Sequence, residues 1–376
     1  MKVLYDHQSF TGMTYGGVSR YFYELMRSFA NRQDIQFELS LLLSNNDYIN
    51  QAPFSRHQRY QHLSHVRNVN RAASLLNRIY SLRRIRAGQY DVFHPTYYHR
   101  YFLNSLGSKP FVLTFYDAAS ERFGDVYPDL GEGLYDVKKT LIERADAIIA
   151  ISEFSKQELL HYFPVSPDKI KVVHLGTAFG TEPMSRPAWI GPATQPVMAE
   201  PFPYVLYVGK RRLYKNFDPF FRAMQPVLHR HPNLHIICAG GGLFSRDEQA
   251  MFHNARLDNR VHYRPVTDAG LLSLYQHARA FVFPSLNEGF GIPVLEAFSG
   301  RCPVVLSDNS SLPEVAADAA LYFNPESDDA LTDAMERVLT DEALRNDLIR
   351  RGTERLRHFS CDKTARQTLD VYQSLR

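Results

Sequence analysis

The sequence predicts an α/β protein with two doubly wound domains, each a parallel sheet covered by helices. Short apolar runs typical of buried strands alternate with helix-like segments along almost the whole chain, and this alternation is the pattern of a parallel sheet. At 376 residues the chain is long for one hydrophobic core and suits two. Between residues 181 and 203 prolines recur and the apolar periodicity disappears, which indicates an interdomain linker.

The N-terminal domain, expected over residues 1–180, begins with a strand and a helix separated by two glycines. The strand covers residues 3–5, and the helix covers residues 18–30 directly after Gly16 and Gly17. Backbone N–H groups at such a helix start can bind an anion, and a tight turn is the alternative reason for the glycines. Further strands are expected at 37–43, 91–93, 111–115, 147–151 and 170–173, with helices at 132–145 and 153–162.

Three polar residues stand at the ends of two of these strands. His94 comes at the end of one strand, and Tyr116 and Asp117 end the next. Ligands of a doubly wound sheet bind at the carboxyl edge of its strands, so we expect these side chains to contact a ligand. A structural role inside the fold is the alternative for His94.

A basic stretch without any acidic residue lies between Asp47 and Asp91. Arginines recur throughout residues 56–86, and apolar residues follow a helical spacing over residues 69–87. Three interpretations are open: contact with an anionic membrane surface, a basic wall for an anionic acceptor, and the solvated face of an ordinary helix. The histidines of this stretch have no metal-ligand spacing with a cysteine, so we expect no zinc site.

The C-terminal domain, expected over residues 204–360, opens with a strand at 204–208 and a strongly basic turn after Gly209. The four cations of this turn are Lys210, Arg211, Arg212 and Lys215. Lysine and arginine at a strand end form charge-assisted hydrogen bonds that suit a diphosphate, and a basic surface turn is the alternative. Later strands are expected at 234–239 and 261–263, and later helices at 271–277, 328–339 and 342–358.

The stretch over residues 281–309 combines a strand, a glycine loop, a helix and a second strand. Glu288 stands before the two glycines of the loop, and Glu296 lies about one turn into the helix. The N–H groups and the dipole at the helix start favour an anion in the loop, while carboxylates accept hydrogen bonds from hydroxyls. The pattern therefore indicates a ligand with hydroxyls on both sides of a diphosphate, which describes a nucleotide sugar. Two glutamates that only stabilise the helix dipole are the alternative.

The sequence NEGFGIPVLEA, which contains both glutamates, resembles the signature of glycosyltransferase family 4. Members of this family are retaining enzymes of the GT-B fold, and their signature has the spacing of Glu288 and Glu296. The sequence GGVSRYFYEL, which begins at Gly16, is similar to the family element that lines the cleft near the donor phosphates and the acceptor. The resemblance covers nearly the whole chain. It implies two Rossmann-like domains facing a central cleft, with the last helix, within residues 361–376, crossing back to the N-terminal domain.

The resemblance also implies which residues bind the donor. Glu288 and the amides after it hold the sugar, and Glu296 holds the ribose. Lys215 and a neighbouring cation, for which we favour Arg212, hold the phosphates, so Glu288, Lys215 and Arg212 are the expected catalytic residues. The turn at Val266 meets the nucleobase, largely through backbone groups. The expected donor-binding residues are Gly16, Gly17, Gly209, Lys210, Val266, Gly289, Phe290, Gly291, Val294, Leu295 and Glu296.

One position departs from the family pattern. Where this chain has Tyr116, the family often has a histidine that contacts the donor sugar. A phenol can also bond a sugar hydroxyl, so Tyr116, Asp117 and His94 are the expected contacts to the acceptor or the sugar. The departure also keeps open a nucleotide-sugar-binding or scaffold protein that has lost catalysis, and a GT-B sugar-nucleotide epimerase is a third possibility.

The expected reaction needs neither a metal nor a cofactor besides the nucleoside-diphosphate sugar. No Asp-x-Asp motif occurs in the chain, which argues against the metal-dependent class of glycosyltransferases. Cations and the helix dipole would instead stabilise the departing diphosphate. By family analogy, the expected acceptor is a glycan or a lipid-linked glycan in polysaccharide biosynthesis.

Composition sets the remaining expectations. A net charge of +3 is too small to indicate nucleic acid, and three scattered cysteines favour a reducing compartment. No signal-peptide h-region is evident, and no apolar run reaches the ~18 residues that a membrane span needs. We therefore expect a cytoplasmic protein, and peripheral contact of residues 56–86 with the inner face of the membrane stays one of the three open interpretations.

Overall fold

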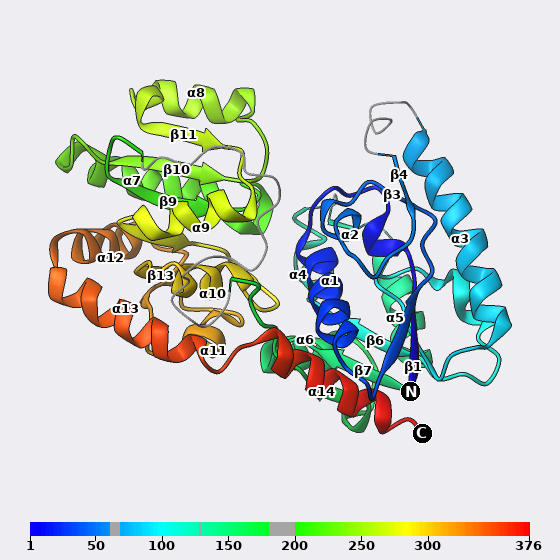
Figure 1. Ribbon diagram of the computed structural model, residues 1–376. Coiled ribbons are helices and arrows are strands. Elements are labelled where there is room, and N and C mark those ends of the chain that lie inside the picture. The colour runs from blue at the N-terminus through cyan, green and yellow to red at the C-terminus, as the bar shows by residue number, and fades with distance from the viewer. Residues whose placement is uncertain (61–67, 128–129, 132, 180–199) are drawn as a thin grey trace. The chain divides into compact units, whose positions relative to one another are not determined.

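The computed structural model describes residues 1–60, 68–127, 130–131, 133–179 and 200–376 (Figure 1). The expected linker, residues 181–203, lies almost entirely outside these described residues. The chain forms two compact units, one of Met1–Gly176 with Cys361–Arg376 and the other of Thr177–Ser360.

The N-terminal unit is built on parallel strands with helices on them. Strands β2, β1 and β5 form one sheet and β6, β7 and β8 another, and a parallel bridge between Phe93 and Phe111 joins the two. The strands are β1 (Lys2–Tyr5), β2 (Gln36–Leu39), β5 (Val92–His94), β6 (Val112–Phe115), β7 (Ala147–Ala150) and β8 (Ile170–Val172), with a separate pair of β3 (Leu43–Ser44) and β4 (Gln58–Arg59). The helices are α1 (Gly17–Ala30), α2 (Asp47–Asn50), α3 (Val69–Ala87), α4 (Ala119–Phe123), α5 (Leu134–Arg144), α6 (Glu153–Tyr162) and α14 (Cys361–Gln373).

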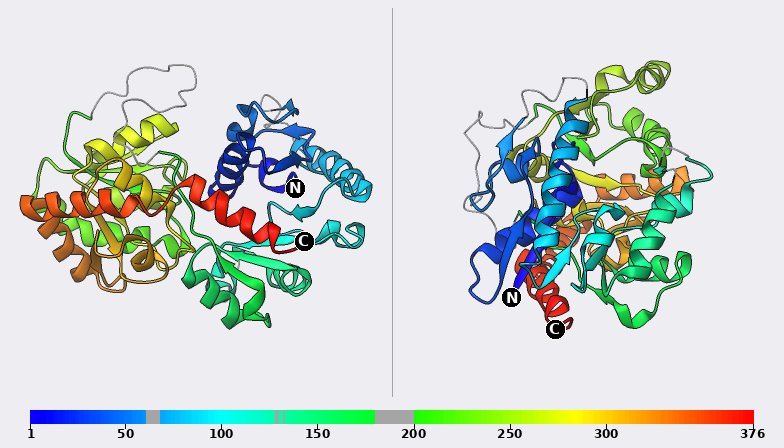
Figure 2. Two further views of the ribbon diagram at one scale, coloured as in Figure 1. Left: turned by 60° about the horizontal axis from the view of Figure 1, so that its bottom comes forward. Right: turned by 90° about the vertical axis from the view of Figure 1, so that its right-hand side faces the viewer.

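The last helix, α14, is part of the N-terminal unit. It lies along α1 (Figure 2), and Ser28 on α1 donates a hydrogen bond to Asp362 at 3.2 Å. Its Tyr372 is fully buried, and the Tyr372 hydroxyl lies 2.9 Å from the hydroxyl of Tyr5 on β1. These contacts place the end of the chain in the core of the unit in which the chain begins.

Helix α3 has the predicted bounds, but its buried face is not its apolar face. The buried residues Ala73, Asn77, Ser81 and Ile85 follow one another at four-residue spacing. The Asn77 amide bonds the backbone of Leu43 in both directions, and the Ser81 hydroxyl lies 2.8 Å from that of Ser40. Because hydrogen bonds hold this face, hydrophobic periodicity did not find it, and Leu75 and Leu76 are left exposed.

The C-terminal unit is a six-stranded parallel sheet in the order β11-β10-β9-β12-β13-β14. The strands are β9 (Tyr204–Val208), β10 (His235–Ala239), β11 (Val261–Arg264), β12 (Ala280–Phe283), β13 (Val304–Ser307) and β14 (Leu321–Phe323). The helices are α7 (Phe217–Arg230), α8 (Arg246–Asn254), α9 (Asp268–His277), α10 (Ile292–Ser299), α11 (Leu312–Ala316), α12 (Asp328–Thr340) and α13 (Glu342–Leu356). The central strands are almost completely buried, as parallel strands covered on both faces must be.

The described helices include none that is both long enough and apolar enough to cross a membrane. The longest helix of the basic stretch, α3, carries charged residues along its length.

Candidate active site

The strand order of the C-terminal unit reverses between β9 and β12. Strands β9 and β12 are direct neighbours, yet the chain continues from β9 outward to β10 and from β12 outward to β13. Loops that leave the carboxyl ends of strands at such a reversal diverge and leave a crevice, where ligands of doubly wound sheets bind. The basic turn follows β9 and the glycine loop follows β12, so the fold brings the two predicted donor motifs to the same crevice.

Lys215 and Glu288 meet at this crevice. The Lys215 ammonium lies 2.6 Å from a carboxylate oxygen of Glu288, and the two side chains are 21% and 12% exposed. The backbone N–H of Leu286 donates to the carbonyl of Tyr214 at 2.7 Å, which holds the two loops together. The pair is thus partly screened from solvent but still reachable by a ligand, and a charge-assisted hydrogen bond fixes its geometry.

The glycine loop has a conformation that requires its second glycine. Gly291 has a φ of 97°, and a Cβ at this position would lie 2.9 Å from a methyl carbon of Leu312. After β13, Ser311 donates to the Glu288 carbonyl at 2.8 Å, and the Asn309 amide donates to the Leu286 carbonyl at 3.1 Å. Sequence reasoning missed these two supports, because nothing in the pattern of residues 309–311 marks them as loop braces.

Three of the predicted donor-binding side chains point into the core. Phe290 is buried and packs edge-on against Phe359, with ring centroids 5.8 Å apart. The side chains of Val294 and Leu295 are completely buried. These residues, like Gly289, can therefore meet a donor only through backbone groups at the start of α10.

Glu296 is far more enclosed than Glu288. It is 4% exposed, and the hydroxyl of Tyr275 on α9 donates to its carboxylate at 3.2 Å. Helices α9 and α10 approach closely here, because a Cβ on Gly300 would lie only 2.5 Å from the Cβ of Tyr275. Tyr275 thus orients the second glutamate of the motif, a role that sequence reasoning missed.

The structure decides which cations of the basic turn face solvent. Arg211 is buried, bonds Glu248 at 2.7 Å, and donates to the carbonyls of Gly240, Gly242 and Leu243. Lys210 and Arg212 are exposed, and within the described residues their side chains form no ion pair. Arg211 therefore shapes the turn after β10, while Lys210, Arg212 and Lys215 are available to an anion.

The remaining donor-binding predictions fall on turns of the expected kind. Gly209 has a φ of +120° and ends β9, and a Cβ on the facing Gly241 would lie 2.5 Å from its carbonyl oxygen. Val266 is partly exposed in the turn between β11 and α9, next to Thr267, whose side chain caps α9.

Neither the backbone conformation nor the packing of the N-terminal unit requires glycine at positions 16 and 17. Gly16 is extended, with a φ of 172°, and neither residue adopts the left-handed conformation. A Cβ on Gly17 would meet no atom within 4 Å, and one on Gly16 only the Ser19 hydroxyl at 3.6 Å. The free space lies in front of the first turn of α1, where a bound ligand would benefit from it.

His94, predicted as a contact to the sugar or acceptor, lies in the core of the N-terminal unit. It is completely buried, with one ring nitrogen 2.6 Å from the Tyr372 hydroxyl and the other 2.9 Å from that of Thr114. Burial lowers the pKa of His94 to about 3, so the ring is neutral. A residue at a strand end can be covered by a helix, here α14, and these contacts favour the structural alternative for His94.

Tyr116 is also turned inward, and only Asp117 of that pair is partly exposed. Tyr116 is 9% exposed, its ring packs against Tyr97 and Tyr98, and its hydroxyl donates to the Thr96 carbonyl at 3.4 Å. The Asp117 carboxylate accepts a hydrogen bond from the backbone of Ala119. In this structure the phenol of Tyr116 takes part in the local packing, and its predicted contact to a sugar stays a prediction.

Two family models match the chain. The N-terminal model, Glycosyltransferase Family 4, covers residues 15–178, and the C-terminal model, Glycosyl transferases group 1, covers residues 194–355. The O-antigen chain mannosyltransferase B of Escherichia coli is 30% identical over 271 residues, which are 70% of this chain and 70% of that protein. The chain is a family 4 glycosyltransferase. The resemblance drawn from NEGFGIPVLEA and GGVSRYFYEL is thereby confirmed, and with it the enzyme class.

A further relative and a solved structure are also similar to this chain. The D-inositol 3-phosphate glycosyltransferase of Corynebacterium aurimucosum is 25% identical over 335 residues, 83% of this chain and 78% of that protein. The structure of the Anabaena protein HepE, in complex with UDP and glucose, matches with a TM-score of 0.75 at 15% identity and covers 100% of both chains. This likeness confirms the predicted GT-B fold of the family 4 enzyme.

Proposed function

We propose that this family 4 enzyme transfers a sugar from a nucleoside-diphosphate sugar to a hydroxyl of a glycan or lipid-linked glycan, with retention of configuration. The observation that carries the proposal is the 2.6 Å contact of Lys215 with Glu288 in the crevice of the C-terminal sheet. There the Glu288 carboxylate, which can accept hydrogen bonds from sugar hydroxyls, lies beside the Lys215 ammonium, which can bind phosphates. Glu288 stands in the loop that leads into α10. The names of relatives, a mannosyltransferase and a protein bound to UDP and glucose, support this donor class.

The donor groups divide among the described residues by their chemistry. The diphosphate binds Lys215, Arg212 and Lys210 and the N–H groups at the start of α10, whose dipole favours the negative charge. The Glu288 carboxylate accepts hydrogen bonds from the sugar. Glu296, oriented by Tyr275, accepts from the ribose through its small exposed area. The nucleobase contacts the turn at Val266.

The transfer needs no proton carrier from the protein in this proposal. The acceptor oxygen attacks the anomeric carbon on the side from which the diphosphate leaves. As the new carbon–oxygen bond forms and the bond to the diphosphate breaks, the acceptor proton moves to the departing phosphate oxygen. Lys215 and Arg212 stabilise the charge that develops there, and no metal takes part. The anomeric configuration of the product, and turnover in the presence of EDTA, test these two statements.

A thermal-shift panel with UDP, GDP, ADP and dTDP tests the donor site. One of these nucleotides at ~100 times its dissociation constant should stabilise the protein by about 2.7 kcal/mol, a shift of roughly 5–10 °C in Tm. Lys215→Ala should weaken that nucleotide at least about tenfold, because it removes a charge-assisted bond and leaves Glu288 to repel the phosphates. Arg337→Ala, on the exposed face of α12 in the same unit, is the matched control. The donor proposal fails if no nucleotide shifts Tm or if both variants behave alike.

We also propose that the protein is cytoplasmic and that the exposed face of α3 contacts the anionic inner surface of the membrane. Leu76 and Ile79 are 49% and 43% exposed, and exposed arginines flank them. Apolar side chains with arginines beside them insert between acyl chains and phosphates. Residues 61–67 of the predicted contact region, 56–86, lie outside the described residues.

Vesicle sedimentation tests the membrane contact. The protein should pellet with vesicles of phosphatidylglycerol and not with vesicles of phosphatidylcholine. The double variant Leu76→Ser with Ile79→Ser should lose most of this binding, whereas Leu160→Ser, at an exposed leucine on α6, should keep it. Equal binding by all three proteins would contradict the proposal.

A further inference from the structure

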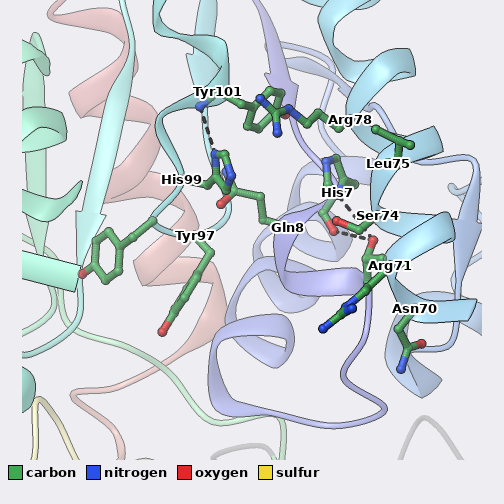
Figure 3. A pocket seen from close by; sticks show the side chains of 12 residues that line it. His7, Gln8, Asn70, Arg71, Ser74, Leu75, Arg78, Tyr97, His99 and Tyr101 are labelled. Carbon is green, nitrogen blue, oxygen red and sulfur yellow. Dashed lines mark hydrogen bonds between the residues drawn. The ribbon is translucent and has the colours of Figure 1, made fainter. Parts of the chain in front are cut away.

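The N-terminal unit contains a cavity of about 520 Å³ between α3 and the segment over residues 97–101 (Figure 3). His7 and Gln8 follow directly on β1, and residues 97–101 come just after β5, the neighbour of β1 in the sheet. The chain order reverses between these two strands, so the cavity occupies the position at which doubly wound sheets bind ligands. The basic stretch over residues 56–86 left a basic wall for an anionic acceptor open as one interpretation, but the sequence did not show which residues of the other segments face it.

The cavity wall on α3 is positively charged. Arg71 and Arg78 both line the cavity and are exposed, and neither forms an ion pair within the part of the chain that the structure describes. The Arg78 guanidinium lies 5.5 Å from the centre of the Tyr101 ring, which positions it over that wall. Figure 3 shows both arginines reaching along the cavity from the same helix.

One buried carboxylate, that of Asp6, lies at the floor of this cavity. Asp6 is completely buried at the end of β1, where it accepts hydrogen bonds from the Thr96 backbone at 2.8 Å and from the Tyr101 hydroxyl at 3.0 Å. The side chains of Thr96 and Gln8 also donate to it. Because these donors occupy both carboxylate oxygens, Asp6 anchors the cavity floor, and it forms no ion pair with Arg71 or Arg78 within the described residues.

Two buried acceptor atoms in the cavity have no partner within the described residues. His7 is 4% exposed, and its Nε2 makes no hydrogen bond; the carbonyl-type oxygen of the Asn70 amide is likewise buried and unbonded. The other ring nitrogen of His7 lies 3.4 Å from the Thr11 hydroxyl, which itself donates to the His7 carbonyl. Because its hydrogen is already donated, the Thr11 hydroxyl can only accept a hydrogen bond from His7 Nδ1. Nδ1 therefore carries the proton of the neutral ring, and Nε2 is an unprotonated acceptor.

The charge state of His7 agrees with this tautomer. Burial lowers the pKa of His7, the Asp6 charge opposes this, and His99 and Arg78 lower it further. The ring is thus neutral at pH 7, and Nε2 is an acceptor. Buried acceptors without partners are rare in folded proteins, and here they lie beside two arginines. A ligand that satisfies the whole wall must carry both an anionic group and hydroxyls.

We propose that this cavity binds the acceptor of the transfer and that the acceptor is an anionic polyol, a sugar or related molecule bearing a phosphate or carboxylate beside free hydroxyls. Arg71 and Arg78 bind the anionic group. His7 Nε2 and the Asn70 oxygen accept hydrogen bonds from hydroxyls. The identity of the ligand as the acceptor rests on the proposed function, whereas the chemistry of the ligand rests on the cavity alone.

Direct binding measurements on the full chain test the chemistry without any turnover. Isothermal titration compares glucose 6-phosphate, glucuronate and inorganic phosphate with neutral glucose at one ionic strength. We expect at least one anionic sugar to bind ~10-fold or more tightly than glucose. Arg71→Gln and Arg78→Gln should each weaken it about tenfold, the factor that corresponds to 1.4 kcal/mol. Arg86→Gln removes the same charge from an exposed position of α3 that does not line the cavity, and it should change nothing.

A second variant separates recognition of hydroxyls from recognition of the anion. His7→Phe keeps a ring in the cavity wall but removes the acceptor nitrogen. It should weaken glucose 6-phosphate and leave inorganic phosphate unchanged. Should this variant unfold, the two arginine variants still decide the matter.

The outcomes also distinguish the sources of the anionic group. Binding of soluble glucose 6-phosphate or glucuronate assigns the cavity to such a sugar. Binding to phosphatidylinositol vesicles assigns it to a lipid headgroup, provided that Arg71→Gln weakens this binding and Arg86→Gln does not. Either result supports the proposal. Equal loss in Arg86→Gln, or anionic sugars that bind no better than glucose with no such vesicle binding, overturns it. Titration of UDP in parallel tests the proposed function separately, since the arginine variants should not alter nucleotide affinity.

Discussion

Replacing Glu288 with glutamine should lower the turnover number of sugar transfer at least about 100-fold, the range seen when a single transition-state contact is removed. The Glu288 carboxylate pairs with Lys215 at 2.6 Å and stands directly before the glycine loop. Glutamine has the same shape but no charge, so it accepts weaker hydrogen bonds from the sugar. The Ser311 hydroxyl donates to the backbone carbonyl of Glu288 and not to its side chain. This contact persists in the variant, so the loop should keep its conformation. Steady-state rates with donor and acceptor measure the effect.

Two controls make this result specific to the position. Glu326→Gln removes a carboxylate from an exposed turn of the same unit and should leave turnover unchanged. Tm of Glu288→Gln should stay within about 2 °C of the original protein, because a partly exposed pair contributes little to stability. A rate within a few-fold of the unsubstituted enzyme would show that Glu288 does not hold the sugar.

Replacing Arg211 with glutamine should destabilise the C-terminal unit by about 3 kcal/mol or more, the cost typical of removing one partner of a buried ion pair. The side chain of Arg211 is 3% exposed and that of its partner Glu248 is 12% exposed. Three carbonyl oxygens of the turn after β10 also receive its hydrogen bonds. Glutamine is too short to reach these groups. Urea unfolding followed by circular dichroism measures the loss.

The adjacent Arg212 provides the matched control for this prediction. Arg212→Gln removes the same charge one residue further along, where the side chain is exposed, and should change stability by less than ~0.5 kcal/mol. Its effect should appear instead in nucleotide affinity. Equal stability of the two variants would contradict the structural role of Arg211.

The loss of stability at acidic pH should also depend on the ion pair between Arg211 and Glu248. Burial on its own would raise the pKa of Glu248, but hydrogen bonds from Arg211 and from the Ser245 backbone lower it overall. A carboxyl whose pKa is lowered by folding contributes stability at neutral pH, and this contribution is lost as pH falls from the unfolded value of ~4.3 toward the folded one. Without Arg211 the folded and unfolded values converge, so this part of the acid dependence should shrink.

The sequence by itself determined the fold class, the family and the residue types of the donor crevice. Alternating strand and helix patterns are enough to predict a doubly wound fold, because the spacing of apolar residues differs between buried strands and helices. The bounds of α3, residues 69–87, were also predicted, although its buried face is not the apolar face that the periodicity indicated. The motif around Glu288 was readable because a glycine loop, its helix and both carboxylates lie within a few turns of one another in the chain.

Only the tertiary structure decided which side chains meet. Lys215 and Glu288 are 73 residues apart, and the strand order of the sheet brings them together. The same is true of His94, whose hydrogen-bond partner Tyr372 lies 278 residues further along the chain. Arg211 and Arg212 are equivalent in sequence, yet the direction of the strand end buries one and exposes the other. In the strands and in most helices, apolar periodicity indicates which residues are buried. The partner of each residue depends on chain topology, which no local pattern contains.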